Sequence, residues 1–267
     1  MKGTIDFYLT QMKLAVIVQF QYPLANYFYM IGMIAEPVIY LVVWSTVAVQ
    51  QGGSVGGYTP ADFAAYYLVW ILVRNMNIVL TPYAWEQYIQ RGFLSMELLR
   101  PIHPLHGQLA YFSGWKFVVI VMWIPLAILL SFIFKPNLDP TAWQLILFFI
   151  ALWGGYLMRF MLLWLLGMIT FWTTRVSAIF ELYFTLELLF SGRLVPLSLM
   201  PEWAQTVANL MPFKWAFGYP IELILGKLTL QQSLLGLGVQ LFWTLLALFF
   251  VRLTWRAAMK KYSAVGA

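Results

Sequence analysis

Six stretches of this 267-residue chain are apolar enough and long enough to lie in lipid. They cover residues 27–49, 63–83, 117–134, 143–172, 176–190 and 234–253. A helix needs about 20 mostly apolar residues to cross a hydrocarbon layer about 30 Å thick, and most of these stretches reach that length. The sequence therefore predicts an all-α integral membrane protein with six transmembrane helices.

The composition leaves no room for a separate water-soluble domain. Hydrophobic residues make up 62% of the chain and charged residues only 10%. The two longest polar intervals, 84–116 and 192–232, are each too short to close a core of their own. We therefore treat residues 1–267 as a single transmembrane domain. Because the chain has no cysteine, disulfides and thiolate metal sites are excluded.

The first 26 residues carry charges within a mixed pattern and do not resemble a signal peptide. Apolar side chains recur there at helical spacing, at Ile5, Tyr8, Met12, Val16 and Phe20. This pattern favours an interfacial helix over 1–26 that Pro23 ends just before the first span.

The distribution of lysine and arginine indicates the orientation of the spans. With both termini inside, ten of these residues fall on the cytoplasmic side and four outside. The inside set is Lys2, Lys13, Arg91, Arg100, Lys116, Arg175, Arg252, Arg256, Lys260 and Lys261, and the outside set is Lys135, Arg193, Lys214 and Lys227. We expect a multi-pass protein of the inner or plasma membrane with cytoplasmic termini. The net charge of +6 then needs no nucleic-acid partner.

Two of the loops have more than a connecting role. In 84–116, a short helix is predicted over 93–99, and Pro101 and Pro104 end it. The charged residues around this helix suit a contact with another protein. The alternative is a loop that only connects two spans and is exposed to solvent. In 192–232, prolines interrupt an apolar segment, which predicts re-entrant helices at 201–211 and from 220 on the external side. The glycine-rich loop before residue 63 predicts a helix start near Thr59 or Asp62.

The motifs of these two loops resemble those of type 2 ABC transporter permeases, the membrane subunits of ABC exporters. They are Arg91-Gly92-Phe93-Leu94, Leu98-Leu99-Arg100-Pro101 and Pro104-Leu105, followed by Ser191-Gly192, Pro196-Leu197, Pro201-Glu202-Trp203 and Pro212-Phe213. The resemblance implies a dimeric pore, as a homodimer or with a second related permease, that docks onto separate ABC ATPase subunits. Within the cytoplasmic loop, the expected ATPase-coupling residues are Arg91, Phe93, Leu94, Glu97, Leu98 and Arg100.

The chain itself has no phosphate-binding loop. The only Gly-Lys pair, Gly226-Lys227, has Ile221 where the motif needs its first glycine and Leu228 where it needs a hydroxyl. ATP and magnesium are therefore expected on the partner subunit, and we expect neither a cofactor nor an enzymatic activity on this chain. His103 and His106 lack the further ligands of a metal site.

Five ionisable residues lie within expected spans, and depth predicts how four of them pair. Glu36 and Arg74 each stand nine residues from the inner end of their spans, about 14 Å deep at about 1.5 Å per residue. Arg159 and Glu187 also match in depth. These pairs either fasten the helices together or line a translocation path.

Further polar residues at this depth are Glu181, Asn75 and Asn77. Three carboxylates against two arginines lean toward a cationic amphiphile as cargo. The preferred interpretation is an exporter permease for hydrophobic or amphiphilic substrates, including cationic drug-like ones, as in multidrug efflux. The alternatives are an ion-coupled carrier or channel that acts without an ATPase, and a membrane enzyme acting on lipid.

Overall fold

The computed structural model describes residues 2–21, 23–79, 82–173 and 176–262. Within these ranges the chain is helical and contains no strand, only an isolated bridge between Val55 and Tyr58. The helices are α1 (Lys2–Gln21), α2 (Pro23–Gln50), α3 (Pro60–Met76), α4 (Pro82–Gln90), α5 (Phe93–Leu98), α6 (Pro104–Phe134), α7 (Ala142–Gly167), α8 (Ser177–Phe190), α9 (Glu202–Leu210), α10 (Pro212–Ala216), α11 (Gly218–Ile224) and α12 (Leu230–Met259), with 3₁₀ turns η1 (Met168–Phe171) and η2 (Leu197–Leu199). The predicted all-α class is confirmed.

Among the described residues, four helices are long and apolar enough to cross a membrane. They cover Leu24–Gln50, Pro104–Phe134, Ala142–Phe171 and Leu230–Met259. The other two expected spans correspond to α3, with 17 residues, and α8, with 14. At a rise of about 1.5 Å per residue these helices are about 25 Å and 21 Å long, less than the thickness of the hydrocarbon layer. Helix length by itself therefore accounts for four crossings.

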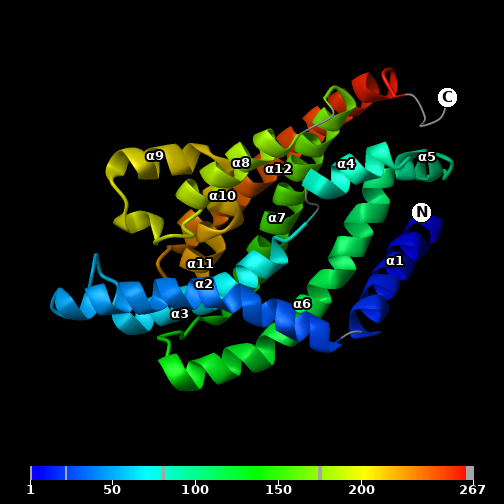
Figure 1. The fold of residues 1–267 in the computed structure, drawn as a ribbon. Helices are drawn as coiled ribbons and strands as arrows, with labels where there is room; N and C mark the ends of the chain where they lie inside the picture. The colour runs from blue at the N-terminus through cyan, green and yellow to red at the C-terminus, as the bar shows by residue number, and fades with distance from the viewer. Residues whose placement is uncertain (1, 22, 80–81, 174–175, 263–267) are drawn as a thin grey trace.

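Several helix ends lie at two opposite poles of the molecule. Figure 1 shows α5, the start of α1 and the end of α12 at one pole, and α9 with the loop before α3 at the other. At the first pole, Tyr8 of α1 hydrogen-bonds His106 at 2.7 Å and the rings of Phe171 and Trp255 lie 6.2 Å apart.

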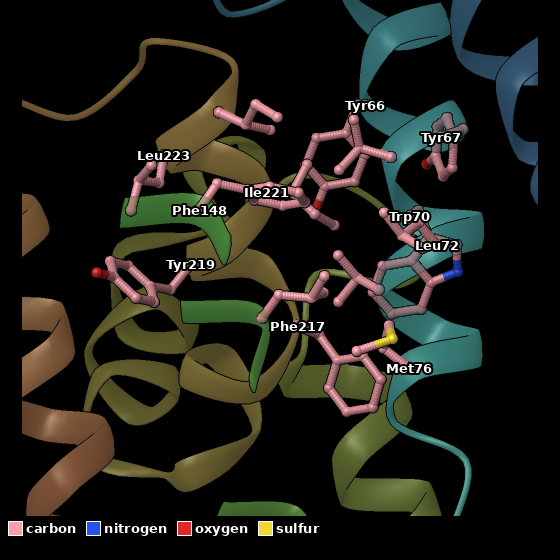
Figure 2. Close-up of a cluster of buried hydrophobic side chains, with 14 of the residues drawn as sticks. Tyr66, Tyr67, Trp70, Leu72, Met76, Phe148, Phe217, Tyr219, Ile221 and Leu223 are labelled. Carbon is pink, nitrogen blue, oxygen red and sulfur yellow. The ribbon is translucent and has the colours of Figure 1, made fainter. Parts of the chain in front are cut away.

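Helix α3 forms the centre of the bundle. It is buried along nearly its whole length and packs against α2, α6, α7 and α11. Figure 2 shows side chains of α3 facing Phe148 of α7, Ile221 of α11 and Phe217 between α10 and α11, and the rings of Trp70 and Phe217 lie 5.3 Å apart. Its start is fixed by a capping box, in which the Thr59 hydroxyl accepts from the Asp62 amide and the Asp62 carboxylate accepts from the Thr59 amide. The predicted helix start is therefore confirmed.

Helix α1 lies alongside α6, where a glycine permits close approach. A Cβ on Gly114 would lie 2.5 Å from the carbonyl oxygen of Met12, so the two backbones pack with no side chain between them. The predicted N-terminal helix is present and ends before Pro23, which begins α2. Ile5 and Phe20, two members of its predicted apolar line, are exposed by 56% and 49%, and the contact side is formed around the buried Ala15.

Two predicted boundaries are wrong here. The third expected span belongs to α6, which starts at Pro104 and not at 117, because proline suits a first helical position and the His103 side chain accepts from the Leu105 amide at 3.2 Å. The interval 84–116 is therefore largely helical. In 192–232, the first expected helix is confirmed as α9, but α10 starts at Pro212 and α11 at Gly218, before the predicted start at 220. Arg175, counted on the cytoplasmic side, lies outside the described residues.

Candidate functional site

Helix α3 ends earlier than its hydropathy predicts. The span was expected to continue to residue 83, but the helix stops at Met76 and α4 begins at Pro82. Two asparagine side chains bond back to the last turn: Nδ2 of Asn75 donates to the Ile71 carbonyl at 2.7 Å, and Nδ2 of Asn77 to the Val73 carbonyl at 2.9 Å. Such local bonds compete with continuation of a helix, and proline at 82 prevents it. The predicted end at 83 is wrong for these reasons.

Cationic side chains donate to backbone carbonyl groups at this break. Nζ of Lys116 donates to the carbonyls of Asn75, at 3.4 Å, and Ile78, and Nη1 of Arg159 donates to the carbonyl of Asn77. Positive groups are favoured at the carbonyl end of a helix. Irregular backbone at membrane depth is tolerated when it is buried in protein and its polar groups are satisfied. Lys116 was expected in a cytoplasmic loop; the structure buries it completely.

Helix α8 also ends beside polar partners from other helices. Beyond its last residue, the hydroxyl of Tyr66 donates to the Gly192 carbonyl at 2.8 Å. The hydroxyl of Tyr67 and the indole nitrogen of Trp44 both donate to the Leu194 carbonyl at 2.9 Å. These donors from α2 and α3 satisfy the irregular segment after α8. Both short helices therefore end in the interior beside carbonyl groups that accept hydrogen bonds from side chains of other helices.

Both ion pairs predicted from depth are present. Arg159 of α7 binds Glu187 of α8 through two hydrogen bonds, from Nε at 2.8 Å and from Nη2 at 3.0 Å, and both side chains are about nine-tenths buried. The guanidinium lies 5.5 Å from the ring centre of Phe217 and 5.8 Å from that of Phe184. Paired geometry of this kind is the strong form of the arginine–carboxylate interaction.

The second pair has a third member. Nη1 of Arg74 donates to Glu36 at 2.8 Å, and Arg193 adds two hydrogen bonds to the same carboxylate, at 2.6 and 2.5 Å. The hydroxyl of Tyr40 also hydrogen-bonds to Glu36. Arg193 follows α8 in the segment expected outside the membrane, and hydropathy gives no sign that it turns back to α2. We call Glu36, Tyr40, Arg74 and Arg193 the Glu36 cluster. It joins α2, α3 and the segment after α8.

All of these charged residues except Glu36 line one cavity of about 270 Å³, which we call the central polar cavity. Its polar lining consists of Tyr29, Arg74, Asn77, Arg159, Glu187, Ser191 and Arg193. The remaining walls are apolar and aromatic, including Trp70, Phe184 and Phe217. The cavity therefore lies where α3 and α8 both end, and it combines fixed charges with apolar walls, as small-molecule sites do.

The charges around the cavity differ from the sequence-based count. Glu181 does not reach it, because this residue lies on the exposed side of α8. Asn75 is buried but does not line it, whereas Asn77 does. With Arg193 added, three arginines face two carboxylates, so the expected acidic excess is corrected to a cationic one. The cationic cargo inferred from that excess loses its basis.

The predicted coupling residues gather around α5, which projects at one pole (Figure 1). Leu94 is fully buried and anchors the helix, and the hydroxyl of Tyr88 donates to the Glu97 carboxylate. Burial and this bond raise the pKa of Tyr88, so the phenol stays neutral. Phe93 and Leu98 are exposed by 50% and 37%, and Arg91 and Arg100 are exposed as well.

Sequence reasoning missed two residues of this face. Met96 is exposed by 68% and Leu99 by 88%, and both project from the same short helix. Apolar residues three positions apart on a helix beside a proline are the signal that identifies them.

The described part of the chain contains no group of three metal-ligating side chains. The pKa of His103 is lowered by burial and by the neighbouring His106.

Long apolar helices, interior ion pairs and a polar cavity define a multi-pass membrane protein. Residues 34–266 match the model of the ABC-2 family transporter protein, and the chain belongs to this family. It is thus a membrane subunit of the ABC-transporter type, a transport subunit of a family that is not typically catalytic, and membership implies association with an ABC ATPase subunit. The comparison with curated proteins gives no match.

Proposed function

We propose that the chain is the permease of an ATP-driven exporter that moves hydrophobic or amphiphilic substrates out of the cytoplasm, with multidrug efflux as one such role. ATP and magnesium bind to a separate ATPase subunit, and α5 receives its motion. The observation that carries this proposal is the exposed face of α5, where Phe93, Met96 and Leu99 stand between Arg91 and Arg100. Aromatic residues, methionine and arginine are enriched in protein interfaces.

We further propose six crossings, made by α2, α3, α6, α7, α8 and α12, in the inner or plasma membrane. The satisfied carbonyl groups after α3 and α8 support crossings by these two short helices, since irregular backbone buried in protein can complete a span. The positive charges at the end of α12 support cytoplasmic termini. In this topology α1 lies along the cytoplasmic interface, and α9, α10 and α11 enter the membrane from outside as re-entrant helices.

The proposed transporter contains a second permease chain, identical or related. Glu181 and Leu182 are both exposed on α8, Leu182 by 62%. A carboxylate at the centre of a lone membrane helix costs about 2.5 to 3.5 kcal/mol, so a membrane helix exposing one needs a protein or aqueous neighbour. A partner chain on this face supplies such a neighbour.

One observation favours a second candidate, an ion-coupled carrier that needs no ATPase. Both α3 and α8 stop at the central polar cavity, and interrupted helices around an interior site are typical of such carriers. Family membership favours the ABC exporter. Transport of ethidium or carboxyfluorescein by this chain alone in liposomes, without nucleotide, would decide for the carrier.

The test of the exporter proposal is charge reversal on α5. We expect Arg100→Glu to lower the ATPase rate of the purified complex at least tenfold, or to release the ATPase, while the chain still inserts into the membrane. Arg252→Glu is the matched control, because Arg252 is an exposed arginine at the same pole outside α5. An Arg100→Glu complex with an unchanged ATPase rate and dye transport contradicts the coupling role.

A further inference from the structure

We infer that the central polar cavity binds the anionic head group of an amphiphilic substrate, an oxyanion such as a phosphate, sulfonate or carboxylate. This inference rests on the proposed function and specifies the chemical class of its substrate. The cavity supplies surplus positive charge, free hydrogen-bond donors, unpartnered buried polar atoms and apolar walls.

The surplus charge comes from the Glu36 cluster. Arg159 and Glu187 form a closed pair with two hydrogen bonds and carry no net charge together. Glu36, in contrast, faces two guanidinium groups, from Arg74 and Arg193. One carboxylate compensates one of them, so one positive charge is left beside the cavity. Lys116 already compensates the carbonyl end of α3, because it donates to the carbonyls of Asn75 and Ile78 at and just after that end.

The two arginines have donors to spare. A guanidinium carries five N–H groups in a fixed planar arrangement. Arg74 uses one of them on Glu36 and Arg193 uses two, and the others have no acceptor among the described residues. The shared carboxylate holds both groups in place before a ligand arrives. Planar guanidinium groups recognise carboxylate and phosphate oxygens with two parallel hydrogen bonds.

Three polar atoms of lining residues are buried and have no partner in the described part of the chain. They are Oγ of Ser191, whose residue is fully buried, and Oδ1 of Asn77 and Nε1 of Trp70, whose residues are each 1% exposed. Buried polar atoms in proteins nearly always have a partner, so each calls for one from outside the chain. The Ser191 hydroxyl can donate to an oxyanion oxygen. Oδ1 of Asn77 can accept from a protonated oxygen or an amide beside it.

The size of the cavity selects a head group and not a whole amphiphile. Its volume of about 270 Å³ lies just below the range of about 300 to 1,000 Å³ for pockets that enclose a drug-sized ligand. Trp70, Phe184 and Phe217 give apolar walls next to the arginines. An oxyanion with the first part of an alkyl chain fits this combination, while the rest of the chain remains outside.

The test is equilibrium binding of radiolabelled hexyl phosphate to the intact transporter, purified in neutral detergent and kept free of nucleotide. We expect hexyl phosphate to bind and hexyltrimethylammonium at equal concentration not to displace it. Arg193→Gln should weaken binding about tenfold, the scale of one lost charge-assisted contact, while Arg74 still neutralises Glu36. Because the variant complex carries the same ATPase, the difference from wild type reports this cavity and not the nucleotide site.

Ser191→Ala is the second variant, since its hydroxyl has no partner to lose and the protein should remain folded; we expect several-fold weaker binding. Arg252→Gln is the control and should bind as wild type does. The inference is overturned by equal or tighter binding of hexyltrimethylammonium, by Arg193→Gln binding like wild type, or by inorganic phosphate competing as well as hexyl phosphate. Each of these results leaves the Arg100 experiment unaffected, so the two proposals fail separately.

Discussion

Removal of the Arg159 guanidinium tests whether the interior ion pairs stabilise the bundle. In the variant Arg159→Met, the aliphatic chain is kept and the charge is lost. Glu187 then remains as a nearly buried carboxylate without its two hydrogen bonds, and the Asn77 carbonyl loses its donor. Because both pair members are only about 10% exposed, solvent cannot replace the lost partner.

The expected magnitude follows from these contacts. Breaking a buried ion pair by removing one partner costs about 3 to 5 kcal/mol. An unpaired buried carbonyl adds about 1 kcal/mol or more. A neutral hydrogen bond between membrane helices averages only about 0.6 kcal/mol. The loss expected for a buried ion pair is therefore several times larger than the loss expected if the contact were an ordinary hydrogen bond. We therefore expect Arg159→Met to lower the free energy of unfolding by about 4 kcal/mol or more.

The measurement is reversible unfolding in mixed micelles of a neutral detergent and dodecyl sulfate, followed by tryptophan fluorescence. Arg252→Met is the matched control, because it removes an exposed arginine that forms no ion pair among the described residues. The double variant Arg159→Met with Glu187→Met should recover most of the loss, since no charge is then buried alone. A loss for Arg159→Met no larger than that of Arg252→Met would refute the reasoning.

Two further predictions concern the contact of α1 with α6 and the pole where α1 begins and α12 ends. Gly114→Leu should separate α1 from α6 and lower the melting temperature by several degrees. Gly107→Leu is the control and should not lower it, because a Cβ at Gly107 meets only a ring atom of Phe7 at 3.9 Å. Equal effects of the two variants would contradict the close approach of α1 and α6 at Gly114. Because the folded-state pKa of His103 is depressed, its contribution to stability is complete above its usual pKa of about 6.5 and is lost as pH falls through the lowered value. Thermal unfolding from pH 8 to pH 5 should therefore show a smaller decline in His103→Gln than in wild type, and an identical decline would rule out this role.

Much of the interior chemistry could be predicted from the sequence because charges are rare in it. Within apolar helices of known rise, the depth of a charge follows from its position, and a buried charge requires a partner at similar depth. Glu36 and Arg74 were therefore paired correctly, as were Arg159 and Glu187. The helix α5 was also predictable, because two prolines and a glycine bound it.

The third arginine and the buried lysine could not be predicted in this way. Arg193 follows a short helix, and hydropathy assigns it to the external side because it does not describe where an irregular segment folds back. Lys116 was counted with the cytoplasmic loop because the carbonyls it binds are freed only by the early end of α3. Both residues depend on helix interruptions that local asparagine bonds and tertiary hydrogen bonds produce.

The amino-acid sequence by itself determined the membrane environment, the helical class, the two ion pairs and the absence of a phosphate-binding loop. Each of these follows from local composition, spacing or depth along one helix. Only the tertiary structure decided that α3 and α8 end in the interior and that their ends share a cavity with a cationic excess. The physical reason is that hydrogen bonds from other helices, which no local pattern encodes, satisfy the backbone where these two helices stop.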